Sequence, residues 1–122
     1  MFYFRGDDEA TSKHGESAYL LRPEVIEGFF YLWRLTGKVI YRDWVWDAIT
    51  SIDRYCRVDG GFSGLRNVND ITKGHDDVQQ SFFLAETLKY AYLTFTDDSV
   101  IPLDKWVFNT EAHPLPVFDP NE

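Results

Sequence analysis

DDVQQSFFLAETLKYAYLTF, residues 76–95, predicts a single long helix with large apolar side chains on almost every side. A helix at the surface of a globular protein is apolar along one stripe, whereas a helix that is apolar all round is enclosed by other elements. Two neighbouring helices cannot enclose it. We therefore expect this helix to pack against more protein than the 122 residues of this chain supply.

The residues before this helix predict two more helices. A 3.6-residue periodicity begins at Arg22-Pro23-Glu24, where proline suits the first turn, and Gly37 predicts its C-terminal end. A second helix is expected from about Tyr41 to Arg57, and the short connection indicates an antiparallel pair. The glycines of Asp59–Gly64 indicate a tight turn or hairpin. The predicted fold class is therefore all-α, with a short hairpin or an extended tail.

The chain has no internal repeat, no low-complexity run and no linker long enough to separate two domains. Residues 1–122 therefore form one structural unit within a single domain. After the third helix, Ile101–Val107 is expected to be extended, and Asn109–Pro114 is expected to form a constrained polar loop.

Composition restricts the classes of partner. The formal net charge is -8, from 20 acidic and 12 basic residues, so the overall field does not attract a nucleic acid backbone. A neutral ligand or a hard divalent cation suits this charge better, although an acidic surface alone also explains it. The single Cys56 excludes an internal disulfide. No apolar run approaches the roughly 18 residues of a membrane span.

The acidic residues of the helices have ordinary explanations. Glu24 lies in the opening turn of a helix, where the unpaired N–H groups favour a negative charge. Glu27 shares one stripe with Tyr31 and Arg34, which is typical of a solvated, charge-balanced face. Glu86 and Lys89 have the spacing of a common i,i+3 helix pair.

A functional hypothesis gathers the scattered carboxylates of Glu24, Glu86 and Glu111 around the aromatic ring of Phe82. Glycoside hydrolysis uses one carboxylic acid to protonate the leaving oxygen and one carboxylate to attack or to activate water. A hard cation would add oxygen ligands such as a threonine hydroxyl. Spacing alone does not distinguish this hypothesis from the ordinary one.

Three segments carry a family resemblance. They are Tyr19-Leu-Leu-Arg-Pro-Glu24, Ser81-Phe-Phe-Leu-Ala-Glu-Thr-Leu-Lys-Tyr90 and Val107-Phe-Asn-Thr-Glu-Ala-His-Pro114. In this order they resemble the C-terminal portion of class I alpha-1,2-mannosidases, the family 47 glycoside hydrolases. Asp76-Asp-Val-Gln-Gln-Ser81 is more similar to the Golgi-type members than to those of the endoplasmic reticulum.

The resemblance implies a seven-fold alpha/alpha barrel, of which this chain would supply the last helices. The rest of the barrel, and a membrane anchor in front of it, would lie upstream of these residues. The implied location is the lumen of the Golgi or of the endoplasmic reticulum, and the implied substrate is a high-mannose N-glycan.

The resemblance also implies a reaction and its residues. Members of the family remove terminal alpha-1,2-linked mannose with inversion and depend on calcium (Ca2+). Glu24 matches the carboxylate that activates the attacking water, and Thr110 matches the direct calcium ligand. The remaining matches hold the calcium's waters or the sugar: Glu27, Glu86 and Glu111 are acidic, Phe82 lies under the ring, and Arg22 is a pocket arginine.

The family's catalytic acid lies upstream of the matching segments, so the isolated chain is expected to be incomplete and inactive. Two other functions remain open. Lectin-like proteins of the endoplasmic reticulum resemble the same family and select misfolded glycoproteins without hydrolysis. A small helical interaction module without sugar chemistry is the third hypothesis, and it predicts no response to calcium.

Overall fold

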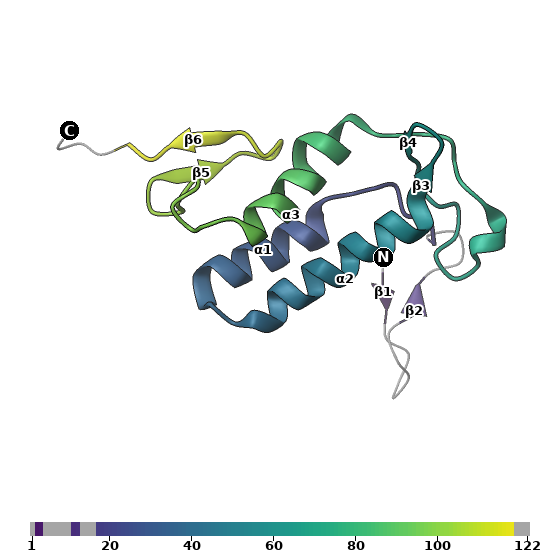
Figure 1. Cartoon of the computed structure of the whole chain (residues 1–122), viewed down its shortest axis with the longest axis horizontal. Coiled ribbons are helices and arrows are strands. Elements are labelled where there is room, and N and C mark those ends of the chain that lie inside the picture. Colours follow the sequence, from purple (N-terminus) through teal and green to yellow (C-terminus); the bar gives the residue numbers. More distant parts are fainter. Residues whose placement is uncertain (1, 4–10, 13–16, 119–122) are drawn as a thin grey trace.

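The computed structural model describes residues 2–3, 11–12 and 17–118, and helices dominate it (Figure 1). The described helices are α1 (Glu24–Thr36), α2 (Val39–Cys56), the short 3-10 helix η1 (Ile71–Lys73), the π-helix η2 (Phe83–Thr87) and α3 (Leu88–Phe95). Within the described part of the chain, no helix has the length and apolar character needed to cross a membrane.

The strands form three separate two-stranded antiparallel sheets. They pair β1 (Phe2–Tyr3) with β2 (Thr11–Ser12), β3 (Arg57–Val58) with β4 (Gly61–Phe62), and β5 (Trp106–Phe108) with β6 (Pro114–Pro116). The helical class is confirmed, as is the hairpin at Asp59–Gly64. The prediction of an extended Ile101–Val107 is correct only near its end, because residues 102–105 turn and Lys105 N–H donates to the carbonyl of Pro102.

The first two helices begin and end close to the predicted positions. Pro23 directly precedes the first turn of α1. At the other end Gly37 adopts a left-handed φ of 65°, and its N–H donates to the carbonyl of Trp33. Because glycine lacks a Cβ, it takes this conformation without steric cost. The chain then reverses, and α2 runs back beside α1.

The helix predicted for residues 76–95 comprises a first turn, η2 and α3, and is called the third helix below. It begins later than predicted. Residues 76–80 are not helical, and the helix starts at Ser81. The Asp76 carboxylate accepts hydrogen bonds from the hydroxyl of Ser63 and the N–H of Val78, both at 3.0 Å. Asp77 takes a positive φ of 63°, which a right-handed helix excludes. Local side-chain bonding therefore overrides the helical pattern at this end.

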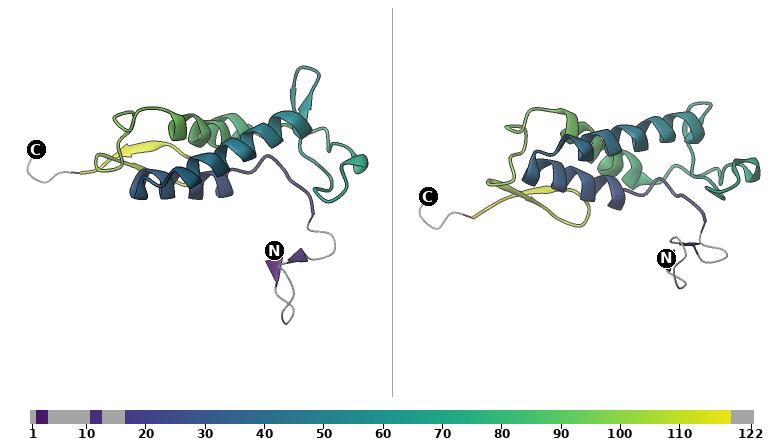
Figure 2. Two further views of the ribbon diagram at one scale, coloured as in Figure 1. Left: turned by 60° about the horizontal axis from the view of Figure 1, so that its bottom comes forward. Right: turned by 90° about the horizontal axis from the view of Figure 1, so that it is seen from below.

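An aromatic cluster joins the third helix to α1, which precedes it, and to β5, which follows it. The ring of Tyr90 on α3 lies 5.4 Å from that of Phe30 on α1 and 5.5 Å from that of Phe108 on β5. Figure 2 shows the three helices side by side, with the β5–β6 hairpin alongside one end of them and the β3–β4 hairpin near the other end. This cluster anchors the β5–β6 hairpin against α1 and α3.

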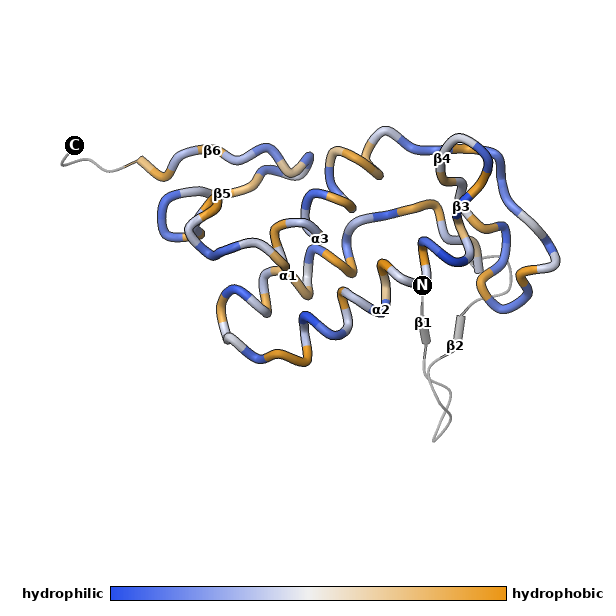
Figure 3. Tube along the Cα trace, viewed as in Figure 1, coloured by the Kyte–Doolittle hydropathy of each residue, from blue (hydrophilic) through white to orange (hydrophobic). Residues whose placement is uncertain are grey.

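Large apolar side chains remain exposed on the helices. Hydrophobic residues recur along all three helices (Figure 3). On the third helix Leu84 is 61% exposed and Tyr92 is 67% exposed, and on α2 Trp46 is 58% exposed. The all-round apolar pattern of the third helix is therefore only half covered by the elements that the structure describes.

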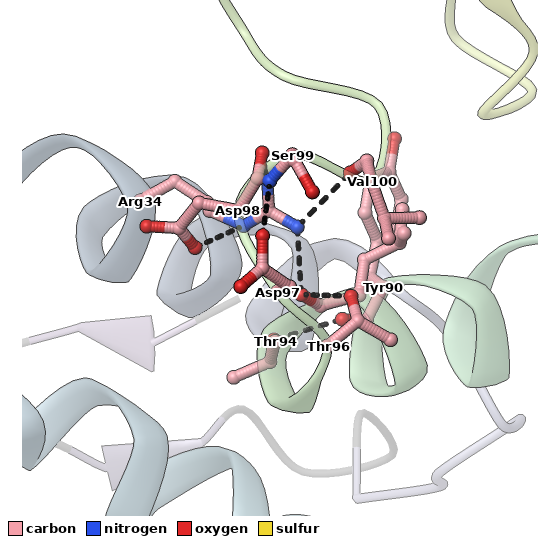
Figure 4. Close-up of polar contacts among 9 residues, drawn as sticks. Arg34, Tyr90, Thr94, Thr96, Asp97, Asp98, Ser99 and Val100 are labelled. Carbon is pink, nitrogen blue, oxygen red and sulfur yellow. Dashed lines mark hydrogen bonds and ion pairs between the residues drawn. The ribbon is translucent and has the colours of Figure 1, made fainter.

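Arg34 on α1 is buried, which contradicts its predicted place on a solvated face. Its side chain is 3% exposed, and its Nε lies 3.2 Å from the Asp98 carboxylate, an ion pair outside hydrogen-bonding geometry. Its terminal nitrogens donate to the carbonyls of Leu93 at 2.9 Å, Asp98 at 3.1 Å and Val100 at 3.2 Å (Figure 4). One guanidinium thus fixes the chain where α3 ends, because its planar donors reach several acceptors at once.

Substitution of Arg34 is expected to destabilise the protein. Arg34→Met keeps most of the side-chain volume but leaves the part-buried carbonyl of Leu93 without its donor and removes the charge-assisted bonds to Asp98 and Val100, so the free energy of unfolding should fall by about 2 to 4 kcal/mol. Arg57→Met is the matched control, because the Arg57–Asp53 pair is exposed and should contribute less than about 1 kcal/mol. Denaturant unfolding of the complete gene product measures both, and equal losses would contradict the assignment.

Candidate active site

Every residue that the sequence analysis assigned to a site lines one pocket of about 220 Å³. Its lining consists of Arg22, Pro23, Glu24, Glu27, Phe82, Glu86, Thr110 and Glu111. These residues come from three separate segments of the chain: the start of α1, the third helix and the β5–β6 turn. The hypothesis that scattered carboxylates meet around Phe82 therefore agrees with the geometry.

The first side of the pocket is the entry into α1. Leu21 is fully buried with a φ of 61°, and this turn brings Arg22 and Glu24 to the pocket. The Tyr19 hydroxyl donates to the Arg22 carbonyl at 3.3 Å. The side chains of Arg22 and Glu24 are 60% and 65% exposed and approach to 4.0 Å, so their ion pair contributes little to stability. Both side chains stay accessible to a ligand.

The second side is the third helix, whose π-helical turn carries the buried acid of the site. The N–H of Leu88 donates to the carbonyl of Phe83, five residues earlier, and such widened turns occur often at functional sites. Glu86 is only 6% exposed. Burial raises the pKa of the Glu86 carboxyl, and the charges of Glu111, Glu27 and Glu24 raise it further, whereas Lys89 opposes them.

The third side is the loop between β5 and β6, which was predicted to be constrained and polar. The Asn109 side-chain oxygen accepts from the N–H groups of Glu111 at 3.0 Å and His113 at 2.9 Å. Ala112 is fully buried with a φ of 56°. Thr110 and Glu111 are exposed at the tip of this closed turn, on the pocket's rim.

Sequence reasoning missed two residues, Tyr90 and Lys89, that do not line the pocket but hydrogen-bond its residues or their neighbours. The hydroxyl of Tyr90, which is 1% exposed, lies 3.4 Å from Oε1 of Glu27 and donates to it. Burial and then the charge of Glu27 raise the pKa of Tyr90, so its hydroxyl stays protonated as a donor. Tyr90 and Glu27 lie 63 positions apart in the sequence, so this hydrogen bond is recognised only in the folded structure.

Lys89 is the second missed residue, and the predicted Glu86–Lys89 pair is wrong. Among the described residues no ion pair joins them. The Lys89 ammonium instead donates to the carbonyl of Ala112 at 2.7 Å. The widened turn before Lys89 changes the directions of neighbouring side chains, so the i,i+3 rule of a regular helix does not hold there.

The donor set of the pocket fits a hard divalent cation. Glu86 is held nearly dry beside three other carboxylates, whose mutual repulsion a cation would relieve. Oxygen atoms of carboxylates, hydroxyls and carbonyls are the ligands that calcium prefers. No three His, Cys, Asp or Glu side chains meet closely enough to hold a metal by themselves in the part of the chain that is described. Direct contact would therefore need oxygens such as those of Thr110, with waters bridging to the carboxylates.

Comparison with known proteins places the chain in a family. The sequence profile of glycosyl hydrolase family 47 matches residues 4–117. A mannosyl-oligosaccharide 1,2-alpha-mannosidase of Caenorhabditis elegans is 72% identical over 117 residues, which cover 96% of this chain and 20% of that protein. The human mannosyl-oligosaccharide 1,2-alpha-mannosidase IB is 61% identical over 95% of this chain and 18% of its own length.

A solved structure is similar as well. The alpha-1,2-mannosidase from Trichoderma reesei superposes with a TM-score of 0.79 and 38% identity, over 84% of this chain and 22% of that one. The chain thus spans about a fifth of the length of the curated relatives it matches. The family resemblance inferred from the three segments is confirmed.

The raised pKa of Glu86 predicts a pH dependence of stability. Its carboxyl holds a proton more tightly when folded, so its contribution is most favourable below the ordinary value of 4.5 and is lost as the pH rises through the folded pKa. Without calcium, Glu86→Gln should therefore unfold at a higher temperature than wild type at pH 7, and the difference should shrink toward pH 4.

Calorimetry of the complete gene product with a chelator present measures this difference. Asp53→Asn is the control, because Asp53 is exposed, lies outside the pocket and should change stability by less than about 0.5 kcal/mol. A Glu86→Gln variant less stable than wild type at pH 7 would contradict the raised pKa.

Proposed function

Because this chain belongs to glycosyl hydrolase family 47, we propose that it is part of an enzyme that hydrolyses terminal alpha-1,2-linked mannose from high-mannose N-glycans. The names of its relatives support this activity. The observation that carries the proposal is the single pocket in which Glu24, Glu86 and Glu111 meet beside Phe82. An aromatic face next to carboxylates suits a sugar, whose ring has apolar C–H faces and hydroxyl edges.

In this proposal the chain supplies the last helices of a seven-fold alpha/alpha barrel. The exposed apolar residues of α2, η2 and α3, among them Trp46, Leu84 and Tyr92, support it, because such residues are normally covered. The remainder of the barrel would lie upstream, together with a membrane anchor. The protein would then work in the lumen of the Golgi or the endoplasmic reticulum, where N-glycans are trimmed.

Glu24 is the proposed general base of an inverting reaction. Its carboxylate takes a proton from water while the water oxygen attacks C1 of the mannose from the face opposite the leaving group. The bond between C1 and the leaving oxygen breaks, and that oxygen receives a proton from an acid outside this chain. Glu24 suits the role because its exposed side chain stands at the start of α1, where the helix favours a negative charge.

The other lining residues bind sugar and ion. Arg22 and Glu111 hydrogen-bond hydroxyls from the rim, Phe82 packs against the ring, and Glu86 accepts from a hydroxyl or a water. Thr110 would hold calcium through its carbonyl and hydroxyl oxygens, while Glu27, Glu86 and Glu111 would hold the ion's waters. Bound calcium supplies a positive charge that orients the sugar hydroxyls.

The base assignment predicts a loss of turnover without a loss of calcium binding. Glu24→Gln in the complete gene product should lower kcat by about 10² to 10⁴-fold, because an amide cannot accept the proton. Release of mannose from an alpha-1,2-linked mannobiose, measured with and without a chelator, tests this. The calcium dissociation constant, measured by calorimetry, should match wild type.

Two results would redirect the proposal. Mannose release by residues 1–122 alone, above the level of Glu24→Gln, would contradict the placement of the acid outside this chain. Calcium-dependent binding of the mannobiose by wild type with no release would favour the lectin-like role over hydrolysis.

The assignment of Thr110 as a calcium ligand predicts a loss of calcium binding, in contrast to the loss of turnover predicted for Glu24→Gln. Thr110→Ala should weaken calcium binding because the side-chain oxygen is lost, whereas Thr110→Ser, the matched control, retains it. Thermal unfolding in the presence of a chelator should be similar for both, since Thr110 is exposed. Normal calcium dependence in Thr110→Ala would exclude the hydroxyl as a ligand.

A further inference from the structure

We propose that Thr87 and Lys89 are positioning residues, which hold opposite sides of the pocket from one helix by hydrogen-bonding the carbonyls of Leu21 and Ala112. The contacts themselves are properties of the fold. Their consequences for catalysis and for calcium rest on the proposed function.

Both held residues adopt a conformation that their side chains disfavour. Leu21 has a φ of 61° and Ala112 a φ of 56°, and both are fully buried. The left-handed region is uncommon for residues other than glycine and persists where the surroundings enforce it. Each of these residues directly adjoins pocket residues, Leu21 before Arg22 and Ala112 after Glu111.

Thr87 holds the first of these turns. Its side chain is fully buried, and its hydroxyl donates to the Leu21 carbonyl at 2.7 Å. The bond supplies a partner to a carbonyl that would otherwise be unpaired and dry. It therefore sets the direction in which the chain presents Arg22 and enters α1 at Glu24.

Lys89 holds the second turn. Its ammonium donates a charge-assisted hydrogen bond of 2.7 Å to the Ala112 carbonyl. The other hydrogen bonds of residues 109–113 stay within the loop, so over residues 17–118 this is the hydrogen bond that links the loop to a helix. The position of Thr110 and Glu111 relative to Glu86 therefore depends on Lys89.

Both donors belong to the helical stretch that carries Glu86. Thr87 follows Glu86 directly and bonds the Leu21 carbonyl, and Lys89 comes three residues after Glu86 and bonds the Ala112 carbonyl. The two turns are thus held close to the buried acid in the sequence of this helix. A single helix sets the spacing of both sides of the pocket from the buried acid.

A simple charge effect of Lys89 predicts the opposite sign. A positive charge near a calcium site repels the ion, so its removal would tighten calcium binding. A positioning role predicts weaker binding, because the loop with Thr110 loses its link to the helix. The sign of the change in calcium affinity separates the two explanations.

The test uses the complete gene product with two pairs of variants. Lys89→Met should weaken calcium binding about 10 to 100-fold in calorimetry, as loss of an outer-shell partner usually does, while Lys89→Arg keeps most of the affinity. Thr87→Val should lower kcat for alpha-1,2-linked mannobiose by about 10-fold or more and leave the calcium dissociation constant within about threefold of wild type. Thr87→Ser should restore kcat.

Tighter or unchanged calcium binding in Lys89→Met would overturn the role of Lys89, and unchanged kcat in Thr87→Val would overturn that of Thr87. If Lys89→Met or Thr87→Val fails to fold, the same measurements are made on Lys89→Gln or Thr87→Ala, respectively.

Amide hydrogen exchange separates this inference from the proposed function. Exchange should accelerate at residues 110–112 in the Lys89 variant and near Leu21 in the Thr87 variant, even if wild type neither binds calcium nor releases mannose. Unchanged exchange in both variants would contradict the positioning roles of Thr87 and Lys89, whatever the activity of the wild type.

Discussion

The packing of Tyr90 against Phe30 and Phe108 is the contact on which the other elements of this structure depend. It brings α1, α3 and β5 together at one point, and the hairpin that follows β5 is short, so its loop can only lie beside the third helix. Because cores are close-packed, one buried aromatic residue in contact with two others leaves little freedom for their relative positions. The three sides of the pocket are the continuation of these three elements.

Buried polar groups fix the placement of elements that apolar packing alone would determine only roughly. Arg34 satisfies carbonyls where α3 ends, Thr87 and Lys89 satisfy carbonyls beside the pocket, and Tyr90 adds a hydroxyl to Glu27. A buried carbonyl without a partner is costly, so each of these bonds disfavours alternative arrangements more than it adds net stability. Glu86 is the exception, because its neighbours raise its pKa and destabilise its charge. A buried acid under that repulsion is typical of a functional site.

The exposed apolar residues of the helices are consistent with the small share of its relatives' length that the chain covers. The third helix is apolar on every side, yet the described elements bury only part of it. The chain matches nearly its whole length to proteins about five times longer. A sequence that folds as part of a larger core keeps apolar residues wherever the rest of that core would lie.

The amino-acid sequence by itself determined α1 and its end at Gly37, the antiparallel α2, the hairpin at Asp59–Gly64 and, through three motifs, the family and the residues that line the pocket. These are encoded locally, in periodicity, glycine positions and short contiguous segments. The tertiary structure alone decided where the third helix begins, that Arg34 is buried, and that Lys89 binds Ala112 and not Glu86. The start of the third helix depends on the hydrogen bonds that Asp76 accepts from Val78 nearby and from Ser63 in the preceding hairpin region. The other two outcomes depend on contacts between residues distant in the chain or on a widened helical turn. No local pattern contains these contacts, because a side chain's partner is set by what the fold places beside it.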